Sequence, residues 1–243
     1  MTCAPPAVSQ LAERLAALGW VTGLLVAGSL ATGDYVPGVS DLDLVALTES
    51  PVGPPRQETL AGLHRELDQA AARGLDLGCQ YVDAGRLTDP GALHPTWTHG
   101  SLVQRTLSEI TRAELVRYGF AVLGRPPAIV LPQVTDDDVR RAARAELCGY
   151  WADAARRPLW WLSPVIADLG LTSMARGRHA LKTGQLLTKT QAIEQAHAPA
   201  WLKDQLRARR RGQQVSSPRL RTALIAWQDA RRTVASAGRT TLR

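Results

Sequence analysis

Apolar residues recur first at helical spacing and then in short uninterrupted runs over the first half of the chain. Leu11, Leu15 and Leu18 share one face of a helix that we expect to begin at Ser9 and to end at Gly19. Short apolar runs predict strands over residues 21–27, 42–47 and 120–123, and alternating apolar and polar residues predict a strand over residues 75–82. Helical spacing returns over residues 60–71. This half therefore alternates helices with strands.

The second half of the chain loses the strand pattern and keeps the helical one. A proline-containing segment, residues 125–132, predicts a linker between the two halves. Helices are predicted at about residues 136–151, 164–183, 188–197 and 218–236. We therefore predict an α+β fold, with a mixed sheet and flanking helices over residues 1–132 and an α-helical bundle domain over residues 133–243.

Composition bears on whether the chain is secreted, membrane-bound or located in a reducing compartment. No stretch approaches the roughly 20 apolar residues that a membrane span needs, and the N-terminus lacks the basic and apolar regions of a signal peptide. Three distant cysteines, Cys3, Cys79 and Cys148, do not form the pattern of a disulfide framework or a thiolate zinc site. We expect a monomer of the reducing cytoplasm with no membrane partner.

The formal net charge is +7, and arginine supplies most of the positive charge. A basic half of this kind can bind nucleic acid or an anionic nucleotide. High arginine together with high alanine is also typical of a GC-rich genome, so we do not expect nucleic acid as a partner. The late cluster comprises Arg207, Arg209, Arg210, Arg211, Arg219, Arg221, Arg231, Arg232, Arg239 and Arg243.

Two aspartates and an upstream Gly-Ser pair give the strongest chemical signal. Asp41 and Asp43 are two residues apart at the start of a predicted strand, so their carboxylates project from the same side. Neighbouring carboxylates repel unless a cation lies between them, and magnesium binds through one or two carboxylates plus substrate phosphates. Gly28 and Ser29 end the preceding strand, where backbone N–H groups and a hydroxyl can hold a phosphate. The competing interpretation is a turn cap at Asp41 beside an ordinary surface residue.

A third carboxylate should face this pair from an adjacent strand. Asp76 is the polar member of an alternating strand and fits that position. Asp83 is the alternative, although it follows the strand and precedes Gly85, where a turn aspartate is common.

These residues resemble the nucleotidyltransferase superfamily with its polymerase β-like fold, whose signature is Gly-Ser followed by Asp-x-Asp on a strand. The similarity is greatest to the aminoglycoside adenylyltransferases that modify streptomycin and spectinomycin. Residues 118–127 resemble that family's junction between domains. Residues 174–176 and 183–185, followed by Lys189, resemble its C-terminal nucleotide-binding helix and loop.

The resemblance implies a role for each matched residue. Asp41 and Asp43 would hold Mg²⁺, and Asp76, which is glutamate in the family, would be the catalytic base and share the metal. Arg176 and Lys189 would contact the triphosphate of ATP. The expected reaction moves AMP from ATP to a hydroxyl of a small molecule and releases pyrophosphate.

One segment departs from the family and leaves the acceptor open. The family recognises its cationic drug partly through acidic residues on the segment that leads into the Arg176 helix, and residues 160–168 contain only Asp168. A polycationic aminoglycoside would bind such a site poorly, so both antibiotic resistance and another polyhydroxylated acceptor stay open. Transfer to a protein hydroxyl and non-catalytic nucleotide or nucleic-acid binding are the alternatives, and the carboxylate trio argues against the second.

Most tryptophans of the chain predict packing rather than substrate contact. Trp97 is our first choice for a substrate-contacting loop, since it lies between His94 and His99. These two histidines are five residues apart with Pro95 between them, which is not the spacing of a helical zinc pair.

Overall fold

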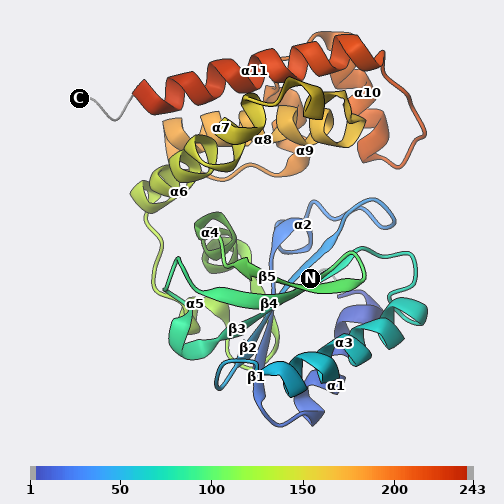
Figure 1. Cartoon of the computed structure of the whole chain (residues 1–243), viewed down its shortest axis with the longest axis vertical. Helices are drawn as coiled ribbons and strands as arrows, with labels where there is room; N and C mark the ends of the chain where they lie inside the picture. The colour runs from blue at the N-terminus through green and yellow to red at the C-terminus, as the bar shows by residue number, and fades with distance from the viewer. Residues whose placement is uncertain (1–3, 240–243) are drawn as a thin grey trace. The chain divides into compact units, whose positions relative to one another are not determined.

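The computed structural model describes residues 4–239 of the chain, so Cys3 and Arg243 lie outside the described residues. The chain separates into two compact units, Met1–Val134 and Thr135–Arg243. The predicted boundary at residue 132 lies two residues earlier. Figure 1 shows the sheet confined to the first unit and an all-helical second unit.

The first unit is built on one mixed six-stranded sheet in the order β5-β4-β3-β2-β1-β6. Strands β2 and β3 are parallel, and the other neighbouring strands are antiparallel. The predicted α+β fold is confirmed. The strands are β1 (Val21–Val26), β2 (Leu42–Thr48), β3 (Leu77–Asp83), β4 (Leu93–Thr98), β5 (Ser101–Thr106) and β6 (Phe120–Leu123).

Helices cover the two faces of this sheet differently (Figure 1). One face packs against α1 (Pro6–Ala17) and α3 (Pro54–Gln69), with Leu24 and Leu42 in a shared apolar core. The opposite face directs Val45 into a second, smaller core. Because side chains alternate along a strand, residues 41, 43 and 45 share this second face. That core contains Leu25, Ala27, Val45, Leu47, Val82, Leu87, Leu107, Leu115 and Leu131.

Helices also line the second face, and the last of them in the chain, α5, corrects our prediction of a linker. These helices are α2 (Gly28–Ala31), α4 (Glu109–Tyr118) and α5 (Pro127–Val130). The predicted linker over residues 125–132 was wrong, since Pro127 and Leu131 are buried within the first unit. Helix α4 was not predicted.

The first helix begins earlier than its sequence signal indicates. It starts at Pro6 rather than after a Ser9 cap, because proline at the first helical position needs no N–H partner and already has the helical φ. Its apolar face is as predicted, with Leu11 and Leu15 fully buried.

The β4–β5 hairpin is the largest element that the sequence pattern missed. Its turn is His99–Gly100, both with positive φ (48° and 73°), the backbone of a type I′ turn. His99 has the only positive φ among non-glycine residues in the described part of the chain. Trp97 is 2% exposed on β4. The prediction of a loop at Trp97 was therefore wrong, although Trp97 is one of the residues that line the pocket described below.

The second unit is a bundle of helices around an apolar core that includes Trp161, Met174 and Leu202. The predicted helix over residues 136–151 is broken at Gly149 into two helices. A helix between residues 197 and 218 was not predicted. The elements are α6 (Asp136–Cys148), α7 (Tyr150–Ala155), the 3₁₀ turn η2 (Pro158–Leu162), α8 (Pro164–Thr183), α9 (Lys189–Gln195), α10 (Ala200–Arg210) and α11 (Arg219–Arg239).

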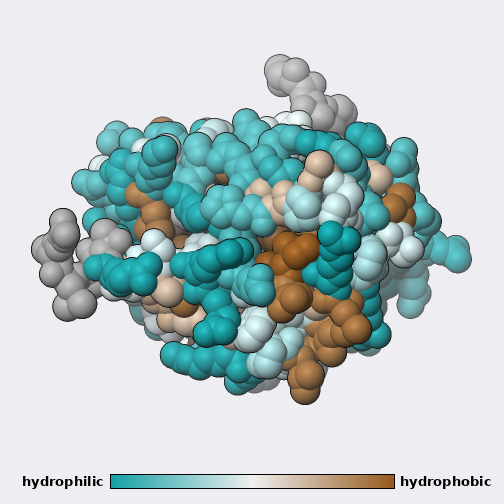
Figure 2. Space-filling model, turned by 90° about the horizontal axis from the view of Figure 1, so that it is seen from above, coloured by the Kyte–Doolittle hydropathy of each residue, from teal (hydrophilic) through white to brown (hydrophobic). Residues whose placement is uncertain are grey.

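The surface of the molecule viewed in Figure 2 is mainly hydrophilic, with hydrophobic residues gathered in one area. The exposed large apolar residues of the helical unit include Leu159, Val165 and Leu220. Between residues 4 and 239, the helices are too short or too polar to cross a membrane.

Candidate active site

The second face of the sheet carries a pocket of about 430 Å³. Asp43 and Gln80 line it from β2 and β3, and Thr96 lines it from β4. These positions share a face because Asp43 pairs with Gly78, two residues before Gln80, and Gln80 pairs with Thr96. The pocket therefore lies across several strands of the sheet.

Asp41 and Asp43 both line this pocket, as their two-residue spacing predicts. Leu42 and Leu44, which alternate with them, are buried on the opposite face. The apolar residues thus anchor β2 while the carboxylates remain accessible. Asp43 is exposed and Asp41 is half-buried.

Gly28 brings the backbone after β1 directly beneath the Asp43 carboxylate. Its φ is +60°, and a Cβ at this position would overlap Asp43 Oδ2. Ser29 is 8% exposed, and its hydroxyl oxygen is buried without a hydrogen-bond partner. Such a buried unpaired group costs free energy unless a ligand or water satisfies it. Ala27, which directly precedes this pair, lines the pocket together with Asp43.

Asp76 joins this pocket, and Asp83 does not. Asp76 lies one residue before β3, where its carbonyl accepts the Leu42 N–H at 2.8 Å. Since β2 and β3 are parallel, their first residues meet at the same end of the sheet. Asp83 pairs with Thr48 at the other end, and its carboxylate accepts the Gly85 N–H at 3.0 Å as the cap of a 3₁₀ turn.

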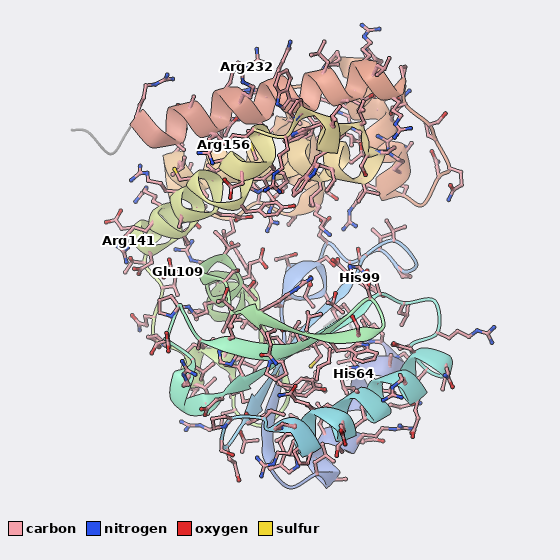
Figure 3. All side chains as sticks on the ribbon, viewed as in Figure 1. His64, His99, Glu109, Arg141, Arg156 and Arg232 are labelled. Carbon is pink, nitrogen blue, oxygen red and sulfur yellow. The ribbon has the colours of Figure 1, made fainter. Side chains whose placement is uncertain are left out.

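His99 reaches toward Asp76 from the tip of the β4–β5 hairpin. Its Nδ1 is 3.7 Å from Asp76 Oδ1, and both side chains are largely exposed. Figure 3 shows His99 on one side of the pocket-bearing face, and Glu109, at the start of α4, on the other.

The donor set suits magnesium bound together with a phosphate, rather than a complete protein cage. Within residues 4–239, no group of three or more His, Cys, Asp or Glu side chains lies close enough to hold a metal ion. Magnesium commonly binds through one or two carboxylates and takes its other ligands from water and substrate phosphates. The Asp43 carboxylate against Gly28, with the unpaired Ser29 hydroxyl beside it, fits that mode.

The wall of the pocket formed by β4, β5 and α4 was missed by the sequence analysis. It is polar and includes Thr96, Arg105, Ser108 and Thr111. The only available signal was a polar, threonine-rich stretch without apolar alternation, which is also the pattern of a loop. Ser108 caps α4 by accepting the Thr111 N–H at 3.0 Å.

A buried aromatic and polar cluster supports this wall from behind. Trp97 donates its Nε1–H to Asp68 at 3.1 Å and stacks on the His64 ring at a centroid distance of 5.0 Å. His64 Nε2 is 2.7 Å from the Tyr81 hydroxyl. Burial lowers the pKa of His64 to about 3, so the ring is neutral near pH 7. Burial also raises the pKa of Asp68.

The other predicted nucleotide contacts lie in the helical unit. Arg176 is on α8 and donates its Nε–H to the Leu187 carbonyl at 3.0 Å. Lys189 begins α9 two residues later, after the Thr188 cap. This hydrogen bond ties the loop that precedes Lys189 to the Arg176 helix.

Replacing Gly28 with alanine should reduce catalysis more than stability. The positive φ costs alanine about 1–2 kcal/mol, and the new methyl would displace the Asp43 carboxylate. A displacement of about 1 Å can reduce turnover about 10²-fold. We expect at least that loss in pyrophosphate release. Gly19→Ala is the matched control, because Gly19 has φ +74° with no atom within 4 Å of its Cβ position. Equal losses in the two variants would contradict the close approach as the cause.

Comparisons with known proteins relate part of the first unit to a known domain family. Residues 8–81 match the model of the nucleotidyltransferase domain family. Among solved structures, the chain is similar to the spectinomycin adenyltransferase AAD(9) from Enterococcus faecialis, whose crystal structure was determined with ATP and spectinomycin. The TM-score is 0.70 at 16% sequence identity, over 93% of this chain and 96% of that chain, which establishes a shared fold. A search of curated proteins finds no match.

Proposed function

Because residues 8–81 match the nucleotidyltransferase domain family, we propose that this chain transfers AMP from ATP to a hydroxyl group of a small molecule. The observation that carries this proposal is the approach of the Asp43 carboxylate to the Gly28 backbone. This approach would put the Asp43 carboxylate, which can bind a cation, next to the Gly28 backbone, which can bind a phosphate. The solved structure with the same fold is of a spectinomycin adenyltransferase with ATP and spectinomycin, which supports ATP and a small molecule as the substrates proposed here.

The nucleotide phosphates would bind at the end of β1. The buried Ser29 hydroxyl lacks a partner and would bond to a phosphate oxygen, and the Gly28 backbone permits its close approach. Asp41 and Asp43 would hold magnesium from the side of β2. When bound, the metal would neutralise the charge of the leaving pyrophosphate. In the helical unit, Arg176 and Lys189 keep their predicted role as phosphate-binding cations.

Asp76 would act as the general base. The acceptor hydroxyl loses its proton to the Asp76 carboxylate while its oxygen forms a bond to the α-phosphorus of ATP. The bond from that phosphorus to the bridging oxygen of pyrophosphate breaks, and pyrophosphate leaves in line with the attack. The largely exposed Asp76 side chain is accessible to such an acceptor.

Pyrophosphate release tests this function directly. The purified chain would be incubated with magnesium, each of the four nucleoside triphosphates, and a panel of aminoglycosides, spectinomycin and simple sugars. We expect release that needs ATP, magnesium and an acceptor, with AMP attached to the acceptor by mass. The absence of release with every acceptor would reject the proposal.

Changing Asp76 should separate base catalysis from nucleotide binding. Asp76→Asn keeps the size and removes the basic oxygen, so we expect turnover to fall about 10²- to 10⁴-fold. The affinity for ATP should change little. Asp76→Glu restores a carboxylate and should retain most of the turnover. Rates with and without saturating acceptor give the comparison, and a fully active Asp76→Asn enzyme would exclude Asp76 as the base.

A further inference from the structure

Strand order separates the side of the pocket proposed to bind ATP from the side available to the hydroxyl substrate. This inference rests on the proposed function. From β1 to β3, the sheet presents Gly28, then Asp43, then Asp76. An in-line reaction needs the acceptor hydroxyl on the side opposite the leaving pyrophosphate. The acceptor therefore lies beyond Asp76, against the wall that β4 and β5 provide.

The chemistry of that wall differs from that of the side proposed to bind ATP. Among the residues that the structure describes, the acids that line the pocket are Asp41, Asp43 and Asp76, and all three belong to the proposed reaction centre. The residues beyond them include hydroxyl groups, an amide and a cation: Gln80, Thr96, Thr98, Arg105, Ser108 and Thr111. Hydroxyl and amide groups recognise a polyhydroxylated molecule, but none of these residues neutralises a cationic one.

Arg105 is the charged group of this wall. It is exposed on β5, and its backbone carbonyl accepts a hydrogen bond from Gln80 Nε2 at 2.9 Å. Within the part of the chain that the structure describes, no carboxylate forms an ion pair with its guanidinium. A guanidinium presents a planar set of donors that matches a phosphate or carboxylate. Arg105 thus favours an anionic group on the acceptor.

Register sets the separation between Arg105 and the proposed base. Arg105 pairs with His94, and His94 lies two residues beyond Thr96, the partner of Gln80. Asp76 precedes Gln80 by four residues, and Arg105 lies two residues past Gln80 in the same direction along the sheet. The backbones of Arg105 and Asp76 are therefore about six residues, or roughly 20 Å, apart along the strand direction. The arginine side chain shortens this distance by several ångströms. An acceptor that reaches both residues is elongated, of about disaccharide length.

Asp168, the only acidic residue of the segment that leads into the Arg176 helix, is engaged within the helical unit. Asp168 accepts hydrogen bonds from Arg209 Nε at 2.6 Å and from Arg209 Nη2 at 2.9 Å, so the pair neutralises itself. Burial raises the pKa of Asp168, which reflects its enclosed position.

We infer that the acceptor is an elongated polyol bearing a phosphate or carboxylate at the end remote from the adenylylated hydroxyl, and that Arg105 binds this anionic group. Removal of a charge-assisted hydrogen bond typically weakens binding about 10- to 100-fold. The same loss is expected in Arg105→Gln for an anionic acceptor.

A matched set of disaccharides tests the inference by equilibrium binding, independently of turnover. Trehalose 6-phosphate, trehalose and 6-amino-6-deoxytrehalose differ in charge at one position. Calorimetric titration of the magnesium- and ATP-analogue-loaded protein should give the tightest binding for the phosphate. In Arg105→Gln that affinity should fall about 10- to 100-fold, with Arg105→Lys between the two. Arg65→Gln is the control, since Arg65 lies on α3 at the opposite face of the sheet.

The outcomes separate this inference from the proposed function. Equal binding of the three sugars, tighter binding of the amino sugar, or an unchanged phosphate affinity in Arg105→Gln would overturn the inference. Adenylylation of a cationic aminoglycoside in preference to anionic sugars would also overturn it while supporting the proposed function. Binding of the phosphate without any pyrophosphate release would support the anion site and reject the proposed reaction.

Discussion

Asp43→Asn should abolish most pyrophosphate release, with a loss of at least about 10³-fold. Asparagine keeps the size of the side chain but removes the negative charge that would hold magnesium against the Gly28 backbone. Charge stabilisation of several kcal/mol is expected from a catalytic metal, and about 4 kcal/mol corresponds to 10³ in rate. Initial rates with ATP and a competent acceptor give the measurement, with magnesium varied to detect weakened metal binding.

Asp83→Asn provides the control for this experiment. Asp83 is also an aspartate of the parallel β2–β3 pair, but it lies at the other end of the sheet and caps a 3₁₀ turn. Its loss should affect stability slightly and leave turnover unchanged. Similar losses in Asp43→Asn and Asp83→Asn would mean that general destabilisation, rather than the pocket, explains the effect.

Acid should destabilise the first unit through His64. The pKa of His64 is about 3 in the folded protein, and its ordinary value is 6.5. Between pH 3 and pH 6.5, His64 is therefore protonated in the unfolded chain and neutral in the folded one. The stability is fully present above pH 6.5 and is lost as pH falls toward 3. The slope approaches about 1.4 kcal/mol per pH unit, or about 5 kcal/mol over the whole window.

Urea unfolding of the wild type and of a His64→Leu, Tyr81→Phe double variant between pH 7 and pH 4 tests this prediction. Both partners of the 2.7 Å hydrogen bond are replaced together, which avoids a buried unsatisfied hydroxyl. The difference in unfolding free energy should change with pH by about one proton. His94, whose pKa is also lowered by burial, is present in both proteins and cancels in that difference. Parallel pH profiles would show that His64 does not carry the effect.

That Asp41, Asp43 and Asp76 line one pocket could be predicted because the signal is local. Asp41 and Asp43 needed only the two-residue period of a strand, and Gly28 needed only its place at a strand end. Asp76 was identified by strand alternation, although it lies one residue before β3. The choice between Asp76 and Asp83 needed the parallel register of β2 and β3, which no local pattern contains.

The wall of the pocket formed by β4, β5 and α4 was not predictable because its strands carry weak strand signals. Pro95 lacks an N–H donor and normally argues against a strand interior. Here Pro95 is tolerated because it does not pair with β3. The residues of β4 that pair with β3 are Thr96 and Trp97. Strand β5 is polar and mostly exposed. Trp97 was assigned to a loop for the same reason, whereas burial on His64 fixes it in the sheet.

The edge position of β5 has a consequence for how this enzyme can change. The residues proposed for chemistry lie at β1, β2 and β3, whereas Arg105 lies on the outermost strand, where only one neighbour constrains it. Substitutions there alter few core contacts, so the choice of acceptor can diverge, in nature or by directed evolution, while the metal and phosphate groups stay fixed. Mutant libraries restricted to β5 and the start of α4 should therefore change which hydroxyl substrate is used with the least effect on stability.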